Sequence, residues 1–219
     1  MSSRGPVCAL AYAAHELRGE VALQLALVEV ALADPNAGTP ALRDMGERVV
    51  AGCHRQERVL EALLMLARSE HGPLRREPVD LAATAVEVLQ AHDHRGLRST
   101  TVLEPARTTG DPPLVERLVA NLVGNAVRHN VPGGRLDLVT RTAAGRAIFT
   151  IANTGPLIPS GELARLFQPF QRLGTRSVDG VGLGLAIVQA IATAHDATVT
   201  ARTRTGGGLG IDVTFPALD

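Results

Sequence analysis

Two long helical runs near the N-terminus constrain the fold more than any other feature. From about Val7 to Ala33, and again from about Ala41 to Ser69, there is no proline, and a seam of mostly apolar residues recurs at spacings of four and three. Such heptad seams are typical of helices that pack along their length. Residues 34–40, with two prolines and a glycine, separate the runs. The pattern predicts an antiparallel hairpin, and because two helices cannot bury both seams, we expect a homodimer with a four-helix bundle.

After Pro73 the pattern changes to short alternating segments mixed with helices. We expect strands at 76–80, 99–103, 135–142, 146–152, 198–203 and 210–215, helices at 81–92, 114–129 and 183–194, and a loop over 154–181. This order is not a regular βαβ series, so the fold class is α+β, with an α/β sandwich after the hairpin. We place the domain boundary between residues 1–72 and residues 73–219.

Composition excludes several classes of function. Lys+Arg and Asp+Glu both number 22, there is no Trp and only one Tyr, so we expect no nucleic-acid partner. Every basic residue is arginine, which excludes a lysine-dependent phosphate loop. Cys8 and Cys53 lack the spacing of metal ligands and are expected to be buried or half-buried reduced thiols.

The N-terminal residues resemble a short secretory leader, with Arg4 ahead of an apolar run. The apolar pattern continues as an amphipathic helix through Val28, however, and a leader would stop earlier. No apolar run approaches the ~20 residues of a membrane span. The chain is therefore expected to lack a leader and a transmembrane segment of its own.

Three polar motifs carry candidate chemistry. Asn121, Asn125 and His129 are spaced by four and share one face of a predicted helix, where two amide oxygens suit Mg²⁺. Residues 153–156, Asn-Thr-Gly-Pro, follow a predicted strand, where a planar ligand can approach the backbone. Residues 180–185 place three glycines at a helix start, where backbone N–H groups bind anions. Each motif alone is also an ordinary surface or turn sequence.

Together these motifs resemble the ATP-binding domain of histidine kinases. Residues 121–129 resemble its N box, 153–156 its G1 box, 167–170 (Phe-Gln-Pro-Phe) its F box and 180–185 its G2 box, in the family's order and spacing. In the first helix, residues 14–18 (Ala-His-Glu-Leu-Arg) resemble the H box of the dimerisation and phosphotransfer domain. The resemblance covers nearly the whole chain.

The resemblance implies a protein-histidine kinase of a two-component system. His15 would accept the γ-phosphate of ATP, Glu16 would orient it or take its proton, and the phosphate would pass to an aspartate of a response regulator receiver domain. Asn125 would bind Mg²⁺ with help from Asn121, His129 would stack on adenine, and Asn153 would meet the adenine amino group. The full set of implied ATP-binding residues is Asn121, Asn125, Arg128, His129, Asn153, Gly155, Arg172, Gly180, Gly182, Leu183 and Gly184. The chain would be the cytoplasmic catalytic portion of a membrane-anchored sensor.

The sequence departs from the family pattern at three places. The G1 position that is usually Asp is Asn153, and from this change alone we expect Asn153→Asp to tighten ATP binding. The usual Thr-Pro after the H box is Gly19-Glu20, which predicts weak phosphatase activity because glycine has no side chain to hold a water. The usual Ser before the phosphoacceptor is Ala14.

Two other functions remain open from the residues. One is a mechanical ATPase of the gyrase and chaperone superfamily, which needs a carboxylate base where Asn121 stands. The other is a dimeric scaffold that binds nucleotide without transferring phosphate.

Overall fold

A computed structural model describes residues 5–34, 37–53, 56, 75–92, 94, 96–169 and 182–218, with side chains from Arg18 onward. The chain divides into two compact units, Met1–Met65 and Leu66–Asp219. The predicted boundary at residue 72 lies outside the described residues.

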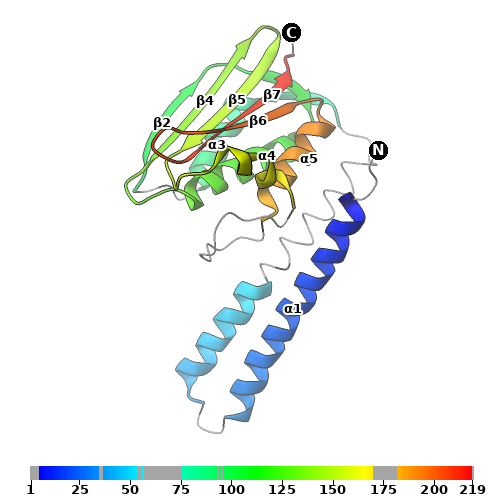
Figure 1. The fold of residues 1–219 in the computed structure, drawn as a ribbon, viewed down its shortest axis with the longest axis vertical. Coiled ribbons are helices and arrows are strands. Elements are labelled where there is room, and N and C mark those ends of the chain that lie inside the picture. Colours follow the sequence, from blue (N-terminus) through cyan, green and yellow to red (C-terminus); the bar gives the residue numbers. More distant parts are fainter. Residues whose placement is uncertain are drawn as a thin grey trace. The chain divides into compact units, whose positions relative to one another are not determined.

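The first unit is the predicted antiparallel hairpin. Helix α1 spans Gly5–Ala33, and a second helix covers residues 39–53 (Figure 1). Gln24 joins the two seams: its Nε2 donates to the Val49 carbonyl oxygen at 3.4 Å, and its Oε1 accepts from Gln56 Nε2 at 3.3 Å. Gly52 is buried, and a Cβ there would lie 2.2 Å from Gln24 Nε2, so glycine at this position leaves room for the glutamine.

The strands that the structure describes in the second unit form two sheets. Strands β1 (Glu77–Asp80) and β3 (Arg107–Gly110) form an antiparallel pair. The larger sheet has the order β2-β4-β5-β7-β6, in which only β2 and β4 are parallel. Its strands are β2 (Arg98–Leu103), β4 (Arg135–Ala143), β5 (Arg146–Asn153), β6 (Thr198–Thr203) and β7 (Leu209–Pro216).

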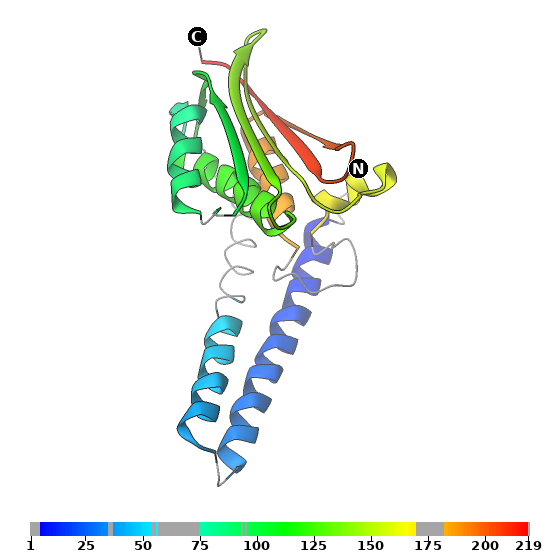
Figure 2. The ribbon, with the colours of Figure 1, turned by 90° about the vertical axis from the view of Figure 1, so that its left-hand side faces the viewer.

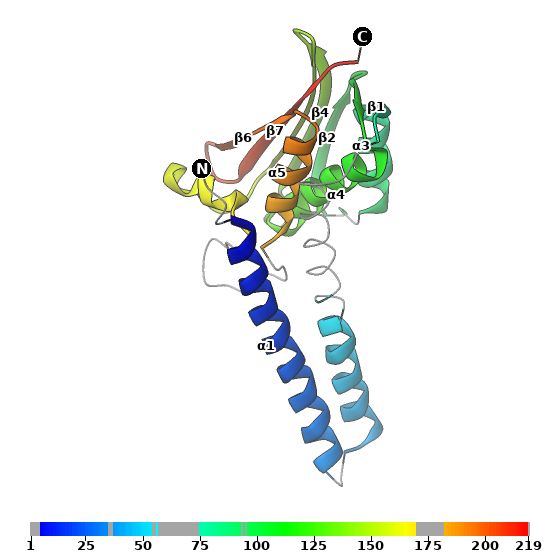
Figure 3. The same cartoon turned by 90° about the vertical axis from the view of Figure 1, so that its right-hand side faces the viewer.

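The described residues of this unit also form the α-helices α3 (Leu81–Ala91), α4 (Pro112–Arg128) and α5 (Gly184–Ala194) and the 3-10 helix η1 (Ser160–Phe167). Helices α4 and α5 pack against each other and against one face of the sheet, and α3 lies beside α4 (Figures 2 and 3). The core between them is apolar, with Leu122, Phe149 and Val213 almost or fully buried. The side chains on the other face of the sheet are exposed or half-buried.

Local sequence signals explain where the helices start. Asp80 Oδ1 accepts from the backbone N–H of Ala82 at 2.9 Å at the start of α3. Asp111 caps α4 in the same way through the N–H of Leu114 at 3.3 Å, with prolines in the first positions. Aspartate at the N-cap followed by proline is a strong helix start, so these positions agree with the expectation from sequence.

The structure differs from the expectation at two segments and at Cys53, a free thiol that is exposed rather than buried or half-buried. Residues 107–110 form strand β3, which the sequence did not predict, because Arg-Thr-Thr-Gly has no apolar alternation. Residues 160–167, expected as loop, form the 3-10 helix η1. Both segments take their structure from contacts distant in sequence: β3 pairs with β1, and η1 packs against α5 and β6.

A buried histidine joins two parts of this unit. His195, at the end of α5, is 0% exposed; its Nδ1 lies 2.7 Å from the Ile191 carbonyl oxygen, and its Nε2 accepts from the Asp111 backbone N–H at 3.0 Å. Nδ1 therefore carries the proton and donates to the carbonyl. Burial lowers the pKa of His195 below its ordinary value, and the neutral ring ties α5 to the start of α4.

Candidate nucleotide site

Helix α4 carries the N box on its polar side. Its apolar side, which includes Leu118, Leu122 and Ala126, is buried, so Asn121 and Asn125 are half-buried at the edge of the core. Arg128 and His129 end the helix and are exposed. The predicted helix is therefore confirmed, and the two asparagine side chains lie along the same side of α4.

The N box meets the start of α5. A Cβ on Gly184 would lie 3.3 Å from Asn121 Oδ1, so the amide oxygen closely approaches the first residue of α5. The Asn121 amide nitrogen is held by the Arg117 carbonyl oxygen at 2.9 Å, which leaves the oxygen directed toward α5. Two predicted boxes far apart in the sequence are thus neighbours in space.

The N-terminus of α5 has no side-chain cap. Gly182 has a φ of +72°, a conformation that glycine adopts readily, and Leu183 at the N-cap position is buried and makes no side-chain cap bond. Within the part of the chain that the structure describes, no side chain caps the first N–H groups of the helix, and free N–H groups at a helix start are the arrangement that binds anions.

The G1 box packs against the end of α4. Asn153 is only 4% exposed, and its Nδ2 donates to the Thr154 carbonyl oxygen at 2.8 Å and to the His129 carbonyl oxygen at 3.5 Å. Both acceptors are backbone oxygens, so the amide orientation is fixed and Oδ1 is left as the acceptor. A Cβ on Gly155 would lie 2.7 Å from the His129 carbonyl oxygen, so this position requires glycine.

A glycine run between β6 and β7 supports the G1 box from its other side. Gly207 and Gly208 have φ values of +101° and +105°. A Cβ on Gly208 would lie 2.0 Å from the Asn153 carbonyl oxygen, and one on Gly207 would lie 2.3 Å from that of Gly155. The sequence pattern placed these residues only between the last two expected strands, although three consecutive glycines are a signal of close backbone approach.

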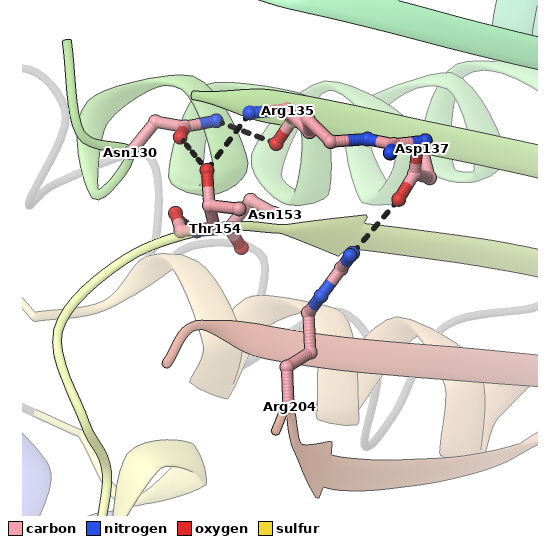
Figure 4. A network of polar contacts seen from close by, with 6 residues as sticks. All are labelled: Asn130, Arg135, Asp137, Asn153, Thr154 and Arg204. Atoms are coloured by element: carbon pink, nitrogen blue, oxygen red, sulfur yellow. Dashed lines mark hydrogen bonds and ion pairs between the residues drawn. The ribbon is translucent and has the colours of Figure 1, made fainter. Parts of the chain in front are cut away.

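A polar network fixes the same loop to the end of α4 (Figure 4). Thr154 Oγ1 donates to Asn130 Oδ1 at 2.6 Å and accepts from the Arg135 N–H at 2.8 Å, and Asn130 Nδ2 donates to the Arg135 carbonyl oxygen at 2.9 Å. Gly134 leaves room for the Asn130 side chain, since a Cβ at position 134 would lie 2.1 Å from Asn130 Oδ1. The sequence pattern included Thr154 in the Asn-Thr-Gly-Pro motif without a role of its own and gave no role to Asn130, because both are also ordinary turn residues.

Several predicted site residues lie outside what the structure describes. His15 and Glu16 are on α1, but their side chains are not among those described. Arg172, Gly180 and Phe170 are outside the described residues altogether. Phe167 is half-buried at the end of η1.

The profile of the "Histidine kinase-, DNA gyrase B-, and HSP90-like ATPase" family matches residues 110–219. Sensor protein CutS of Streptomyces coelicolor is 42% identical over 212 residues, which cover 93% of this chain and 51% of CutS. Probable sensor histidine kinase TcrY of Mycobacterium tuberculosis is 34% identical over 209 residues, covering 90% of this chain and 43% of TcrY. The chain thus spans about half the length of the curated relatives it matches.

Solved structures agree with the fold. Acinetobacter baumannii histidine kinase AdeS has a TM-score of 0.73 at 23% identity, covering 94% of this chain and 98% of AdeS. Histidine kinase ThkA, solved in complex with response regulator TrrA, also has a TM-score of 0.73, at 19% identity, covering 95% of this chain and 61% of ThkA. No helix among the described residues is long and apolar enough to cross a membrane. The matched family profile, which covers the N box, G1 box and G2 box, and the sensor relatives together show that this chain belongs to the histidine kinase-, DNA gyrase B- and HSP90-like ATPase family, as a sensor histidine kinase.

Proposed function

We propose that this protein phosphorylates its own His15 with ATP and then passes the phosphate to an aspartate of a response regulator receiver domain. The observation that carries the proposal is the approach of Asn121 Oδ1 to Gly184 at the uncapped start of α5. It brings a polar amide and a helix N-terminus together, as a phosphate chain requires. His15 lies on the first helix of the hairpin, and the class of reaction is inferred from the sensor kinase relatives.

The reaction exchanges one bond at phosphorus in each of two steps. A neutral His15 ring nitrogen attacks the γ-phosphorus of ATP, a P–N bond forms, the bond to the β–γ bridging oxygen breaks, and ADP leaves. Glu16, the next residue along α1, takes or orients the ring proton. In the second step the partner's aspartate oxygen attacks the same phosphorus, and the P–N bond breaks.

Mg²⁺ is proposed as the metal that accompanies ATP. Hard cations take oxygen ligands, and Asn125 is half-buried, one helical turn from Asn121, with no hydrogen bond from its side chain to any described residue. Its amide oxygen therefore fits such a site, and the metal would neutralise phosphate charge there. We expect Asn125→Ala to lose Mg²⁺-dependent nucleotide binding, measured by calorimetry with and without Mg²⁺.

Adenine is proposed to bind at Asn153. The amide nitrogen is committed to two backbone carbonyls, so Oδ1 is available as an acceptor for the adenine amino group. His129, exposed at the end of α4, is proposed to stack on the base, and Arg128 and Arg172 to bind phosphate. Gly155, Gly180, Gly182 and Leu183 complete the proposed site. A solved relative, ShkA, was crystallised in complex with AMPPNP, an ATP analogue.

A homodimer is proposed from the hairpin. Val21 and Leu42 are seam residues, yet they are 52% and 41% exposed in a single copy. A second hairpin would cover them in a four-helix bundle. We further propose that the full protein is anchored in a membrane and that this portion works in the cytoplasm, because sensor proteins such as CutS are about twice the length of this chain.

Weak phosphatase activity is proposed from Gly19, one helical turn after His15. Gly19 is exposed, and nothing lies within 4 Å of a Cβ built there, so a larger residue fits without displacing its neighbours. The test follows decay of a phosphorylated receiver domain with ADP present, comparing the native chain with Gly19→Thr. Faster decay with the threonine variant supports the proposal, and fast decay with the native chain contradicts it.

A mechanical ATPase is the second candidate. It requires a carboxylate to activate water, but Asn121 is an amide whose nitrogen already donates to Arg117. ADP release without a phosphorylated protein would favour that function. A scaffold that binds nucleotide without transferring phosphate would yield neither ADP nor phosphorylated protein.

The decisive experiment incubates the chain with γ-labelled ATP and compares it with His15→Ala. We expect acid-labile, base-stable label on the native protein only, while both proteins bind ATP equally well. Label that persists on His15→Ala would contradict the assignment of the phosphoacceptor.

A further inference from the structure

The face of the larger sheet that α4 and α5 leave uncovered carries all of the charged residues of its five strands. They are five arginines and two aspartates, and Arg204, just beyond β6, reaches back to the same face through its 2.9 Å bond to Asp137. We call this surface the arginine face; its arginines are Arg98, Arg135, Arg141, Arg146, Arg202 and Arg204. The chain as a whole has no net charge, so positive charge is concentrated here.

Folding alone does not account for this concentration. Arg98 and Arg135 are Cα partners in the β2–β4 pairing, and like charges opposite each other on paired strands are destabilising. Asp137 offsets part of the repulsion, since Arg204 and Arg135 lie 2.9 Å and 3.6 Å from its two oxygens. Arg98, Arg141 and Arg146 are exposed and have no ion-pair partner among the residues that the structure describes, so their guanidinium groups are accessible to a ligand.

The arginine face is also hollowed. A shallow basin of about 450 Å³ lies over β4, β5, β7 and β6, on the face opposite to the one that the N box helix covers. Val139 and Ile148 form an aliphatic floor, and Arg141 lines the rim. Asp212 lies within it, accepting from Thr150 Oγ1 at 2.6 Å and pairing with Arg202. A concave surface with apolar floor, hydroxyl groups and guanidinium rim is suited to protein side chains.

From these contacts we propose that the arginine face docks a protein partner through a carboxylate-rich surface. The planar guanidinium binds carboxylates in a two-point geometry, and arginine is enriched at protein interfaces. The two aspartates on the face are paired with arginines and interrupt its positive charge, so spaced carboxylates match it better than the continuous charge of a nucleic acid or an anionic membrane. A protein surface with carboxylates at the rim and apolar side chains over the basin complements all of these features.

A labelled oligomer of alternating glutamate and leucine residues serves as the probe, because it carries both the carboxylates and the apolar side chains of the proposed partner surface, and its binding to the whole chain is measured by fluorescence anisotropy. The test variant replaces Arg98, Arg141 and Arg146 by Gln. The matched control replaces Arg75, Arg76 and Arg107 by Gln, which removes the same charge from exposed arginines paired with Glu77, Asp196 and Asp80. ATP binding by both variants confirms that they fold.

We expect the test variant to bind the oligomer about tenfold more weakly, and the control to bind within about twofold of the native chain, because nearby charges dominate at physiological salt. Equal losses in both variants, or no loss in the test variant, would overturn the proposal. A single-stranded DNA oligomer and phosphatidylserine vesicles are measured in parallel. Tighter binding to either one, lost in the test variant, would also overturn it, because the face would then be a site for phosphate polyanions.

Discussion

Thr154 Oγ1 donates a 2.6 Å hydrogen bond to Asn130 Oδ1, and this contact joins the end of the N box helix to the loop proposed to hold adenine. The same hydroxyl accepts from the Arg135 N–H at 2.8 Å. Neither side chain belongs to the residues that the family resemblance assigns to ATP. Their role is to hold the loop in the conformation that the ligand needs, so that binding does not have to order it.

Thr154→Val removes this hydroxyl at nearly constant volume. One lost hydrogen bond is worth about 1 kcal/mol, so we expect ATP affinity to fall by about five- to tenfold. Calorimetry measures the affinity, and Thr154→Ser, which keeps the hydroxyl, should restore it. Thr142→Val is the matched control, because the Thr142 hydroxyl donates to the Pro105 carbonyl oxygen at 3.0 Å, away from the site. Equal effects at both threonines would show that the loss is general destabilisation.

Asn153→Asp is expected to weaken ATP binding, although the sequence alone predicted the opposite. An aspartate would place a carboxylate oxygen where Nδ2 now donates, 2.8 Å from the Thr154 carbonyl oxygen and 3.5 Å from that of His129. Two acceptors facing each other repel, and a buried acceptor without a donor costs about 1–3 kcal/mol. We expect at least a tenfold rise in the dissociation constant for ATP, measured by calorimetry. Tighter binding by the variant would mean that the loop turns to accommodate the acid.

Gly155→Ala is expected to abolish nucleotide binding and lower the melting temperature. The added Cβ would lie 2.7 Å from the His129 carbonyl oxygen, a backbone atom that cannot move aside without shifting the end of α4. Gly161→Ala provides the comparison, since nothing lies within 4 Å of a Cβ at that position. Thermal melts and ATP titrations of the two variants should separate clearly, and similar behaviour would contradict the close packing at Gly155.

His195 predicts a stability change in mildly acidic solution. The pKa of His195 in the folded state is lowered, mainly by burial. Below the unfolded-state pKa of about 6.5, the histidine is therefore protonated in the unfolded chain while it stays neutral in the folded chain. The stabilisation is complete above that pH and is lost as pH falls toward the folded pKa. Urea unfolding between about pH 7.5 and pH 5 measures it, with a slope of at most about 1.4 kcal/mol per pH unit from this group. A His195→Gln variant should be less stable at neutral pH and show a smaller slope; an unchanged slope would assign the effect to other groups.

Patterns within a segment could be predicted from sequence, and contacts between distant segments could not. The seam containing Gln24 predicted the hairpin, and the alternation in residues 146–152 predicted β5, because each periodicity is visible within one element. Strand β3 was missed because its residues acquire structure only opposite β1. The boxes were recognisable from their residues. The Asn130–Thr154 hydrogen bond, however, joins residues that are 24 positions apart, and the close approach of Gly208 to Asn153 depends on the pairing of β5 with β7.

The glycine turn ahead of β7 sets an order of events during synthesis. Gly207 and Gly208 lie close against the backbone of the G1 box. Strand β7 pairs with the full length of β5, from Arg146 to Asn153. When the N box and the G1 box have left the ribosome, the nascent chain still lacks the strand and the turn that close the proposed adenine side of the site. Nucleotide can therefore help to stabilise this domain only after β7 has emerged, and not while translation of the domain is under way.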